Sequence, residues 1–201
     1  MPRSFAWFFW ISALGVALVS WRVLLAPVEW VMPAMAHYLA DFPLSLAAHV
    51  FLGPLALLLA PFQLWQGLRR RRPGLHRWLG RLYALAILGG GLASVALMPG
   101  FQGSAFAASG FVALAVLWIG TTLWGIGRAR AGDLAAHRRW MQRSVALTFA
   151  AVTLRLIMAP LMAAGWSVTE TYEITAWGSW LINLAVLEVW QQRRSAALRR
   201  A

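Results

Sequence analysis

Long apolar segments divide this chain, and they constrain its fold more than any other feature of the sequence. A helix needs about 20 mostly apolar residues to cross the roughly 30 Å of hydrocarbon in a bilayer. Segments of this kind cover residues 5–26, 44–67, 78–98, 106–127, 140–164 and 173–192. The connections between them are short, so successive helices should pack as antiparallel neighbours. The sequence therefore predicts an all-α polytopic membrane bundle of about six transmembrane helices, forming one domain over residues 1–201.

The composition also indicates a membrane protein. The chain of 201 residues is 61% hydrophobic and only 12% charged, with a mean hydropathy of +0.65. A soluble domain of this length has too little interior to bury so many apolar side chains. The 13 tryptophans are also typical of a membrane protein, because indole rings favour the headgroup region. Cysteine is absent, which excludes disulfides, thiolate metal sites and cysteine nucleophiles.

Two segments in the N-terminal quarter need separate interpretation. The stretch "VEWVMPAMAHYLADFP" at 28–43 is too polar and too often interrupted by proline to span, so we expect an interfacial segment. The segment 5–26 has an apolar run too long for a signal peptide, a single basic flank at Arg3, and no good small-x-small cleavage site. We expect it to be retained as a helix.

The distribution of arginine predicts the orientation. All 18 basic residues are arginine. Most of them should lie on one side, namely Arg3, Arg69 to Arg72, Arg77, Arg81, Arg128, Arg130, Arg138, Arg139, Arg143, Arg193, Arg194, Arg199 and Arg200. The connections at 28–43, 99–105 and 165–172 contain none. The positive-inside rule then predicts that both termini are cytoplasmic, which for a bacterial protein of the family named below means an inner-membrane protein.

The net charge of +12 and the pI near 11.9 are explained mainly by this topology. Some affinity for anionic lipid headgroups is expected from the same arginines. Nucleic acid is not an expected partner, whereas the lipid bilayer is.

A short cassette occurs twice in the chain. "LHRWLGR" at 75–81 and "HRRWMQRS" at 137–144 each place histidine, arginine and tryptophan before an apolar segment. Arginine and tryptophan at such a position are ordinary interfacial anchors, which explains much of each cassette. His76 and His137 are nevertheless predicted to stand at equal depth, at the cytoplasmic entrances of the third and fifth helices.

Polar side chains continue from each cassette into the membrane. On the fifth helix a spacing of three, four or seven places one set on a single face: His137, Met141, Ser144, Thr148 and Arg155. Arg155 is the most informative of these, because an arginine inside a span is costly and marks an ion pair, a cofactor contact or a substrate path. The third helix has a matching face, consisting of His76, Gly80, Tyr83, Ile87, Gly90 and Ser94. For the run at 89–91, tight helix packing is the preferred interpretation.

By depth, the polar residues of the spans form two predicted clusters. The inner cluster comprises His76, His137, Tyr83, Gln63, Glu188 and flanking arginines. The outer cluster comprises His49 and Arg155, with Arg22, Asp41, Tyr172 and Glu173 as further candidates. His37 is interpreted as interfacial. Asn183 lies in the middle of the sixth segment, and Glu188, near its cytoplasmic end, is open to a purely structural ion pair.

Several longer stretches resemble a known family. They are "HVFLGPLALLLAPFQLW", "RRRRPGLHRWLGRLYALA", "HRRWMQRSVALTFAAVTLR" and "WGSWLINLAVLE". Together they resemble a family of bacterial multi-pass membrane proteins known as DUF2306, a domain of unknown function, over roughly residues 44–192. Matching positions include His49, Pro54, Gln63, His76, Arg77, Gly80, Tyr83, His137, Arg138, Trp140, Met141, Arg143, Ser144, Thr148, Arg155, Trp180, Asn183 and Glu188. The resemblance implies a membrane bundle and marks these residues, but it implies no reaction.

The chemistry is therefore inferred from the residues themselves. Histidines at equal depth on facing helices are how helical bundles hold b-type haem, with imidazole as the axial ligand. Neighbouring arginines could pair with the propionates. The first hypothesis is a redox protein with one haem or quinone site, where His76 and His137 are candidate axial ligands. Candidate cofactor-binding residues are His76, His137, His49, Tyr83, Arg77, Arg138, Arg143, Arg155, Gln63, Glu188 and Asn183.

Two other classes of function remain open. Buried His, Glu and Arg side chains could relay protons or bind a small anion in a transporter or channel-like protein. The chain could instead be an accessory subunit that packs against a larger membrane protein and performs no chemistry. A zinc or di-iron site is a poor fit without a cluster of carboxylates, and the spacing of a hydrolase triad is missing.

Overall fold

The computed structural model describes the backbone of residues 3–200 and the side chains of residues 6–197. Within that part of the chain the fold is helical and contains no β-strand. The long helices are α1 (Arg3–Ser20), α4 (Pro43–Leu64), α6 (Pro73–Ala96), α7 (Ala105–Arg130), α8 (Leu134–Thr148), α9 (Ala150–Ala163) and α10 (Val168–Arg200). Shorter turns connect them, namely η1 (Trp21–Leu24), α2 (Val28–Val31), η2 (Pro33–Met35), α3 (Tyr38–Asp41), α5 (Gln66–Arg71) and η3 (Met98–Gly100).

Five of the predicted spans are long and apolar enough to cross a membrane. They are Ala6–Leu24, Pro43–Leu64, Pro73–Gly100, Ala105–Arg130 and Leu134–Ala163. The last of these comprises α8 and α9, separated at Phe149. The sixth predicted span, 173–192, lies inside α10, a helix of 33 residues that is long enough at about 1.5 Å per residue. Its Glu173, Asn183 and Glu188 dilute the apolar run, so a count of six remains a prediction.

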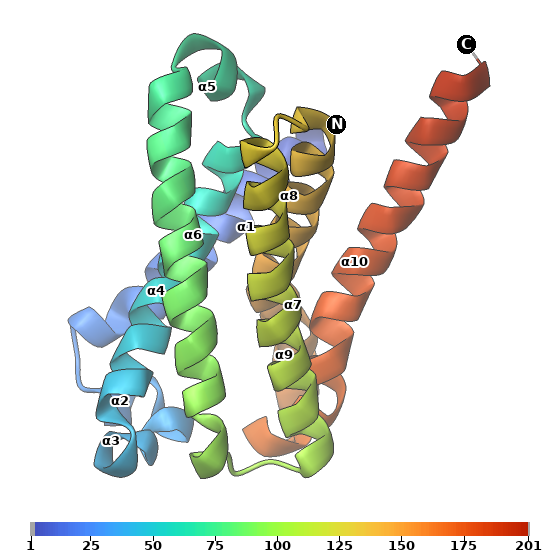
Figure 1. Cartoon of the computed structure of the whole chain (residues 1–201). Helices are drawn as coiled ribbons and strands as arrows, with labels where there is room; N and C mark the ends of the chain where they lie inside the picture. Colours follow the sequence, from blue (N-terminus) through green and yellow to red (C-terminus); the bar gives the residue numbers. More distant parts are fainter. Residues whose placement is uncertain (1–2, 201) are drawn as a thin grey trace.

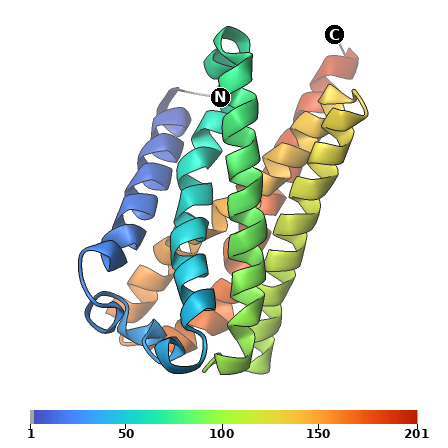
Figure 2. The same ribbon diagram turned by 60° about the vertical axis from the view of Figure 1, so that its left-hand side comes forward.

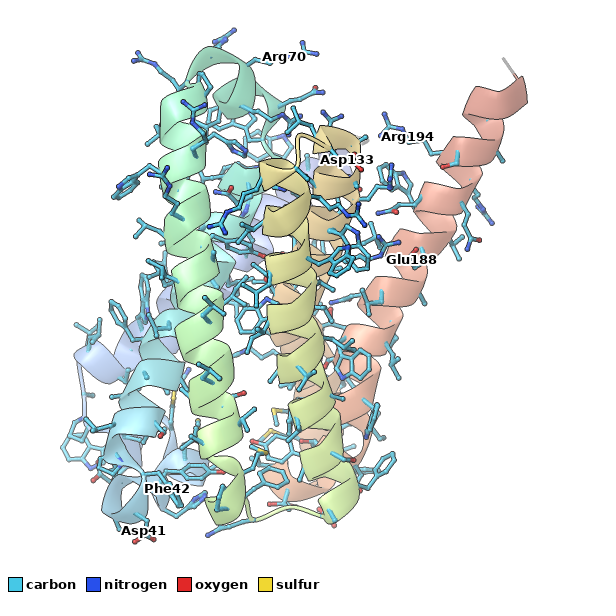
Figure 3. All side chains as sticks on the ribbon, in the orientation of Figure 1. Asp41, Phe42, Arg70, Asp133, Glu188 and Arg194 are labelled. Atoms are coloured by element: carbon cyan, nitrogen blue, oxygen red, sulfur yellow. The ribbon has the colours of Figure 1, made fainter. Side chains whose placement is uncertain are left out.

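The helices form one antiparallel bundle (Figure 1). Helix α4 packs along α6, and α7 packs along α8. Helix α1 lies beside α4 (Figure 2), and α10 packs on α9, α7 and α8. The bundle has an arginine-rich end, marked by Arg70 and Arg194, and an opposite end, marked by Asp41 (Figure 3). Both ends of the described chain lie at the arginine-rich end (Figure 1).

The helices begin earlier than the apolar pattern predicts, because capping residues precede it. Asp133 accepts a hydrogen bond from the backbone N–H of Ala136 at 2.8 Å, so α8 starts more than a turn before residue 140. At α10, the Ser167 backbone N–H donates to the Glu170 carboxylate at 2.7 Å, and the Glu170 N–H donates to the Ser167 hydroxyl. This reciprocal capping box starts the helix at Val168 instead of residue 173. These contacts lower the pKa of the Glu170 carboxyl. The larger effect comes from the hydrogen bond with the Ser167 backbone N–H, and the smaller one from the Ser167 hydroxyl.

The stretch 28–43 lies at the opposite end as a chain of short turns, α2, η2 and α3, and none of them is a candidate span. Two contacts anchor it to the bundle. The Arg22 Nε donates to the carbonyl oxygen of Val31 at 2.8 Å, and the His37 Nε2 lies 3.1 Å from the carbonyl oxygen of Gly100. His37 therefore has a local structural partner.

Close approach of α4 and α6 forms the core of the bundle. A Cβ placed on Gly90 would lie 3.3 Å from the backbone nitrogen of Gly53. Tyr83 and Ile87, on the same face of α6, are fully buried. Small residues permit this backbone contact, as they do in membrane helix pairs generally. The glycine run in α6 therefore packs helix against helix.

The predicted orientation can be tested with reporter fusions. Because both described ends lie at the arginine-rich end, fusions after residues 102 and 201 should report opposite compartments, with residue 201 cytoplasmic. Paired alkaline phosphatase and green fluorescent protein fusions measure this. The same compartment at both positions would contradict the six-span topology, and an outside report at residue 201 would contradict the orientation.

Candidate functional site

A buried glutamine that lacks a hydrogen-bond partner lies on α4, near the arginine-rich end of the bundle. Gln63 is 8% exposed, and its Oε1 lies 3.1 Å from the position that a Cβ on Gly80 of α6 would occupy. Its Nε2 is buried and has no hydrogen-bond partner. Burying an amide donor without a partner costs about 1–3 kcal/mol. Such an atom in a tightly packed bundle therefore indicates a missing acceptor.

His76 also has a buried nitrogen without a hydrogen-bond partner. It lies one turn before Gly80 on the same face of α6, and its Nδ1 is buried without a partner. Because Gln63 packs against Gly80, the two unpartnered nitrogens belong to the same interface between α4 and α6. The absence of Cβ at Gly80 leaves the space that the Gln63 amide uses.

His137, the histidine of the second cassette, is oriented by α7. Its Nδ1 lies 2.8 Å from the carbonyl oxygen of Gly125. A carbonyl only accepts, so Nδ1 carries the proton and the Nε2 lone pair is free. His76 and His137 lie within range of each other's charge, so the structure brings both cassettes to one region.

Arginines surround this region. Arg69 of α5 and Arg77 of α6 lie within charge range of His76, and Arg138 of α8 lies near Arg69. Partial burial lowers the pKa of the Arg69 guanidinium, and the charges of Arg138 and Arg70 lower it further. Among the described residues none of these arginines has a carboxylate partner. The region therefore attracts electron-rich groups.

A buried hydroxyl network lies deeper in the bundle, below the two histidines. The Tyr83 hydroxyl is 2.7 Å from Thr148 Oγ1 and 3.1 Å from Ser144 Oγ. Helix α7 completes the network: Thr122 Oγ1 lies 2.7 Å from Ser144 Oγ, and the Trp118 indole N–H donates to Thr148 at 2.8 Å. Neither Thr122 nor Trp118 was predicted from the sequence to belong to a polar network. The two adjacent threonines at 121–122, inside an otherwise apolar helix, are the feature that could have indicated Thr122.

The predicted polar face of the fifth helix divides at Phe149. Ser144 and Thr148 of α8 contact Tyr83. Arg155 follows on α9, where its Nη2 donates to Ser20 Oγ of α1 at 3.1 Å and its Nη1 donates to the carbonyl oxygen of Ala151. Arg155 therefore faces α1, away from the hydroxyl network.

Three candidate residues belong to the contact between α8 and α10. Arg143 donates to both carboxylate oxygens of Glu188, at 2.6 and 2.9 Å, and its guanidinium lies 4.8 Å from the ring centroid of Trp140. The Asn183 Nδ2 donates to the carbonyl oxygen of Ala146 at 3.0 Å, and its Oδ1 accepts from the Thr153 hydroxyl. These residues do not join the histidines in one cluster. Arg143, Glu188 and Asn183 hold α8 against α10, so Glu188 forms the structural ion pair that was considered for it above.

The outer cluster is assembled only in part. His49 Nδ1 lies 3.4 Å from the carbonyl oxygen of Gly90, and His49 is within charge range of Arg155. Arg155 is also within charge range of Arg22 and Tyr172. The two candidate carboxylates, at positions 41 and 173, are exposed, and in the described part of the chain neither forms an ion pair.

The fold and its polar interior define a multi-pass helical membrane protein. A family model described as "Predicted membrane protein (DUF2306)" matches residues 46–191, and the chain belongs to this family. No curated protein and no solved structure matches the chain.

Proposed function

We propose that this chain is a membrane redox protein that binds a quinone headgroup at the arginine-rich end, between α4, α6 and α8. The observation that carries the proposal is the pair of buried, unpartnered nitrogens, Gln63 Nε2 and His76 Nδ1. A quinone headgroup carries carbonyl oxygens, which are the acceptors that these nitrogens lack. A quinone also partitions into the bilayer that surrounds the bundle.

The neighbouring side chains suit a ligand of this class. An amide nitrogen and an imidazole nitrogen can each donate one hydrogen bond to a carbonyl oxygen. A quinone supplies two-electron, two-proton redox chemistry when it is bound. Near it, the imidazoles of His76 and His137 can each donate or accept a proton, and Arg69 and Arg138 favour negative charge at the site.

Haem b is the second candidate, and one observation favours it. The bond from His137 Nδ1 to the Gly125 carbonyl is the arrangement that orients a metal-ligating histidine through Nε2. His76 has no such partner, because its Nδ1 is unbonded. The fit to a bis-histidine haem is therefore incomplete, whereas both unpartnered nitrogens fit a quinone.

Binding of decylubiquinone and of a short-chain menaquinone analogue to protein in nanodiscs tests the proposal. Loss of one hydrogen bond costs about 1 kcal/mol or more, so Gln63→Leu and His76→Ala should each weaken binding at least about fivefold. Gln63→Leu should leave the free energy of unfolding unchanged or raise it, because it removes a buried, unpartnered amide. That combination is expected of a ligand group and not of a packing residue.

Matched controls lie at the opposite end of the bundle. Gln102 is exposed and His37 contacts Gly100, so Gln102→Leu and His37→Ala should leave quinone affinity unchanged. An intense Soret band in protein from haem-replete cells, lost in His76→Ala and His137→Ala, would replace the quinone with haem b. Colourless protein that binds neither quinone would refute both candidates and favour a transporter-like protein or an accessory subunit.

A further inference from the structure

A second polar region lies in the opposite half of the bundle, where α1 meets α9. Ser20 ends α1, and Arg22 follows two residues later in η1. The Arg155 Nη2 donates to Ser20 Oγ at 3.1 Å, which brings the Arg155 guanidinium beside the turn that carries Arg22. Their charges are close enough to repel each other. Ser20 itself is 4% exposed.

Among the side chains that the structure describes, no carboxylate pairs with either guanidinium. The oxygen partners of Arg155 are a carbonyl and a hydroxyl, and Arg22 donates to the carbonyl oxygen of Val31. In the part of the chain that the structure describes, the one ion pair joins Arg143 to Glu188, on another face of the bundle. Two neighbouring cations within membrane spans are costly without a counter-charge.

Arg155 is accessible in this region. Its side chain is exposed although it lies inside a predicted span. His49 and Tyr172 are half-buried and lie within range of the Arg155 charge. The guanidinium of Arg155 can therefore be reached by a small group.

The guanidinium groups have donors to spare. Each carries five N–H bonds, and Arg155 uses two of them, on Nη1 and Nη2. Both contacts lie on one side of the group, so Nε–H and one N–H on each terminal nitrogen stay free. Carboxylate and phosphate oxygens are the preferred partners of such a fork. A phosphate group presents several acceptor oxygens and up to two charges, so it can bridge two guanidinium groups.

We infer that the region around Arg155, Arg22 and Ser20, with His49 and Tyr172 beside it, binds a phosphate oxyanion. The phosphate belongs either to a phospholipid headgroup, entering from the outer leaflet, or to a small soluble anion. The site is separate from the arginine-rich end and does not depend on quinone binding there.

The inference is tested with two probes on the full chain. In dodecyl maltoside micelles, which contain no phosphate, titration with inorganic phosphate should raise the unfolding temperature, which measures a small soluble anion. In nanodiscs of phosphatidylcholine and phosphatidylglycerol, native mass spectrometry should detect retained phospholipid, which measures a lipid headgroup. A response to at least one probe is expected, and the responding probe identifies the source of the phosphate.

Single substitutions test whether the measured response comes from the two arginines of this region. Arg155→Gln and Arg22→Gln should each weaken the responding interaction at least tenfold, and Arg139→Gln, an exposed arginine at the other end, should not. If Arg155→Gln does not fold, Arg22→Gln decides. No response to either probe, or an equal loss in Arg139→Gln, would overturn the inference. Quinone affinity should be unchanged in Arg22→Gln, so the two proposals fail independently.

Discussion

Replacement of Gly90 by valine is expected to destabilise the bundle by about 3 kcal/mol, because overpacking of a well-packed interface costs about 1–3 kcal/mol and sometimes more. A Cβ at this position would lie 3.3 Å from the backbone nitrogen of Gly53 and 3.5 Å from the Cβ of Leu52. Backbone cannot rotate out of the way as a side chain can, so α4 and α6 must separate. The free energy of unfolding, from denaturant titration in detergent micelles, measures the effect.

Gly120 of α7 supplies the matched control. A Cβ there would meet no heavy atom within 4 Å, and the residue is exposed on the outer face of the bundle. Gly120→Val should therefore change the free energy of unfolding by less than about 0.5 kcal/mol, as substitutions away from packed contacts do. Equal destabilisation by both valines would show that helix propensity, and not the contact with Gly53, governs position 90.

Sequence periodicity predicted the helical class and the positions of the spans because lipid imposes a length and an apolar composition on each of them. The same rule explains where the prediction was weakest. Asn183 and Glu188 interrupt the apolar run of α10, and their polarity is matched by partners on α8 and α9. A hydropathy scale evaluates each residue as if it faced lipid, so it cannot include partners that are supplied by the fold.

Helix faces were predictable only over short distances. The i, i+4 and i, i+7 relations placed His137, Ser144 and Thr148 together, and the Tyr83 contacts agree with that face. Arg155 lies seven residues after Thr148, so the same spacing placed it on that face, but its side chain contacts Ser20 of α1. The turn at Phe149 and the tilt of α9 change which neighbour a face meets. Which helix a side chain meets depends on packing, and one sequence does not specify it.

The candidate site was predictable in its members more than in its geometry. The repeated cassettes pointed to His76 and His137, and Gln63 was chosen for its depth. The unpartnered state of two nitrogens and the role of the Gly125 carbonyl depend on distances between α4, α6, α7 and α8. The proposal of a quinone in preference to haem rests on those features, which the sequence does not contain.

Removal of Arg143 from its ion pair with Glu188 should also lower the free energy of unfolding substantially. The Glu188 carboxylate is then left without a partner in the contact between α8 and α10. The pair is bidentate, at 2.6 and 2.9 Å. Loss of one member of a fully buried pair costs about 3–5 kcal/mol. The side chains here are 23% and 37% exposed, which lets water screen part of the charge that remains. We therefore expect Arg143→Met to cost about 2 kcal/mol, measured as the free energy of unfolding.

The double variant separates the charge effect from packing. In Arg143→Met with Glu188→Leu no uncompensated charge remains, and apolar side chains of similar volume are frequently as stable as an ion pair. We expect the double variant to recover most of the 2 kcal/mol or so that the single variant loses, giving a coupling energy of about 1 kcal/mol or more in the cycle. Additive losses would mean that Arg143 stabilises α8 mainly by its contact with Trp140, 4.8 Å from the ring centroid. In that case Trp140→Leu should cost as much as Arg143→Met, and the carboxylate of Glu188 would be free for a role outside this contact.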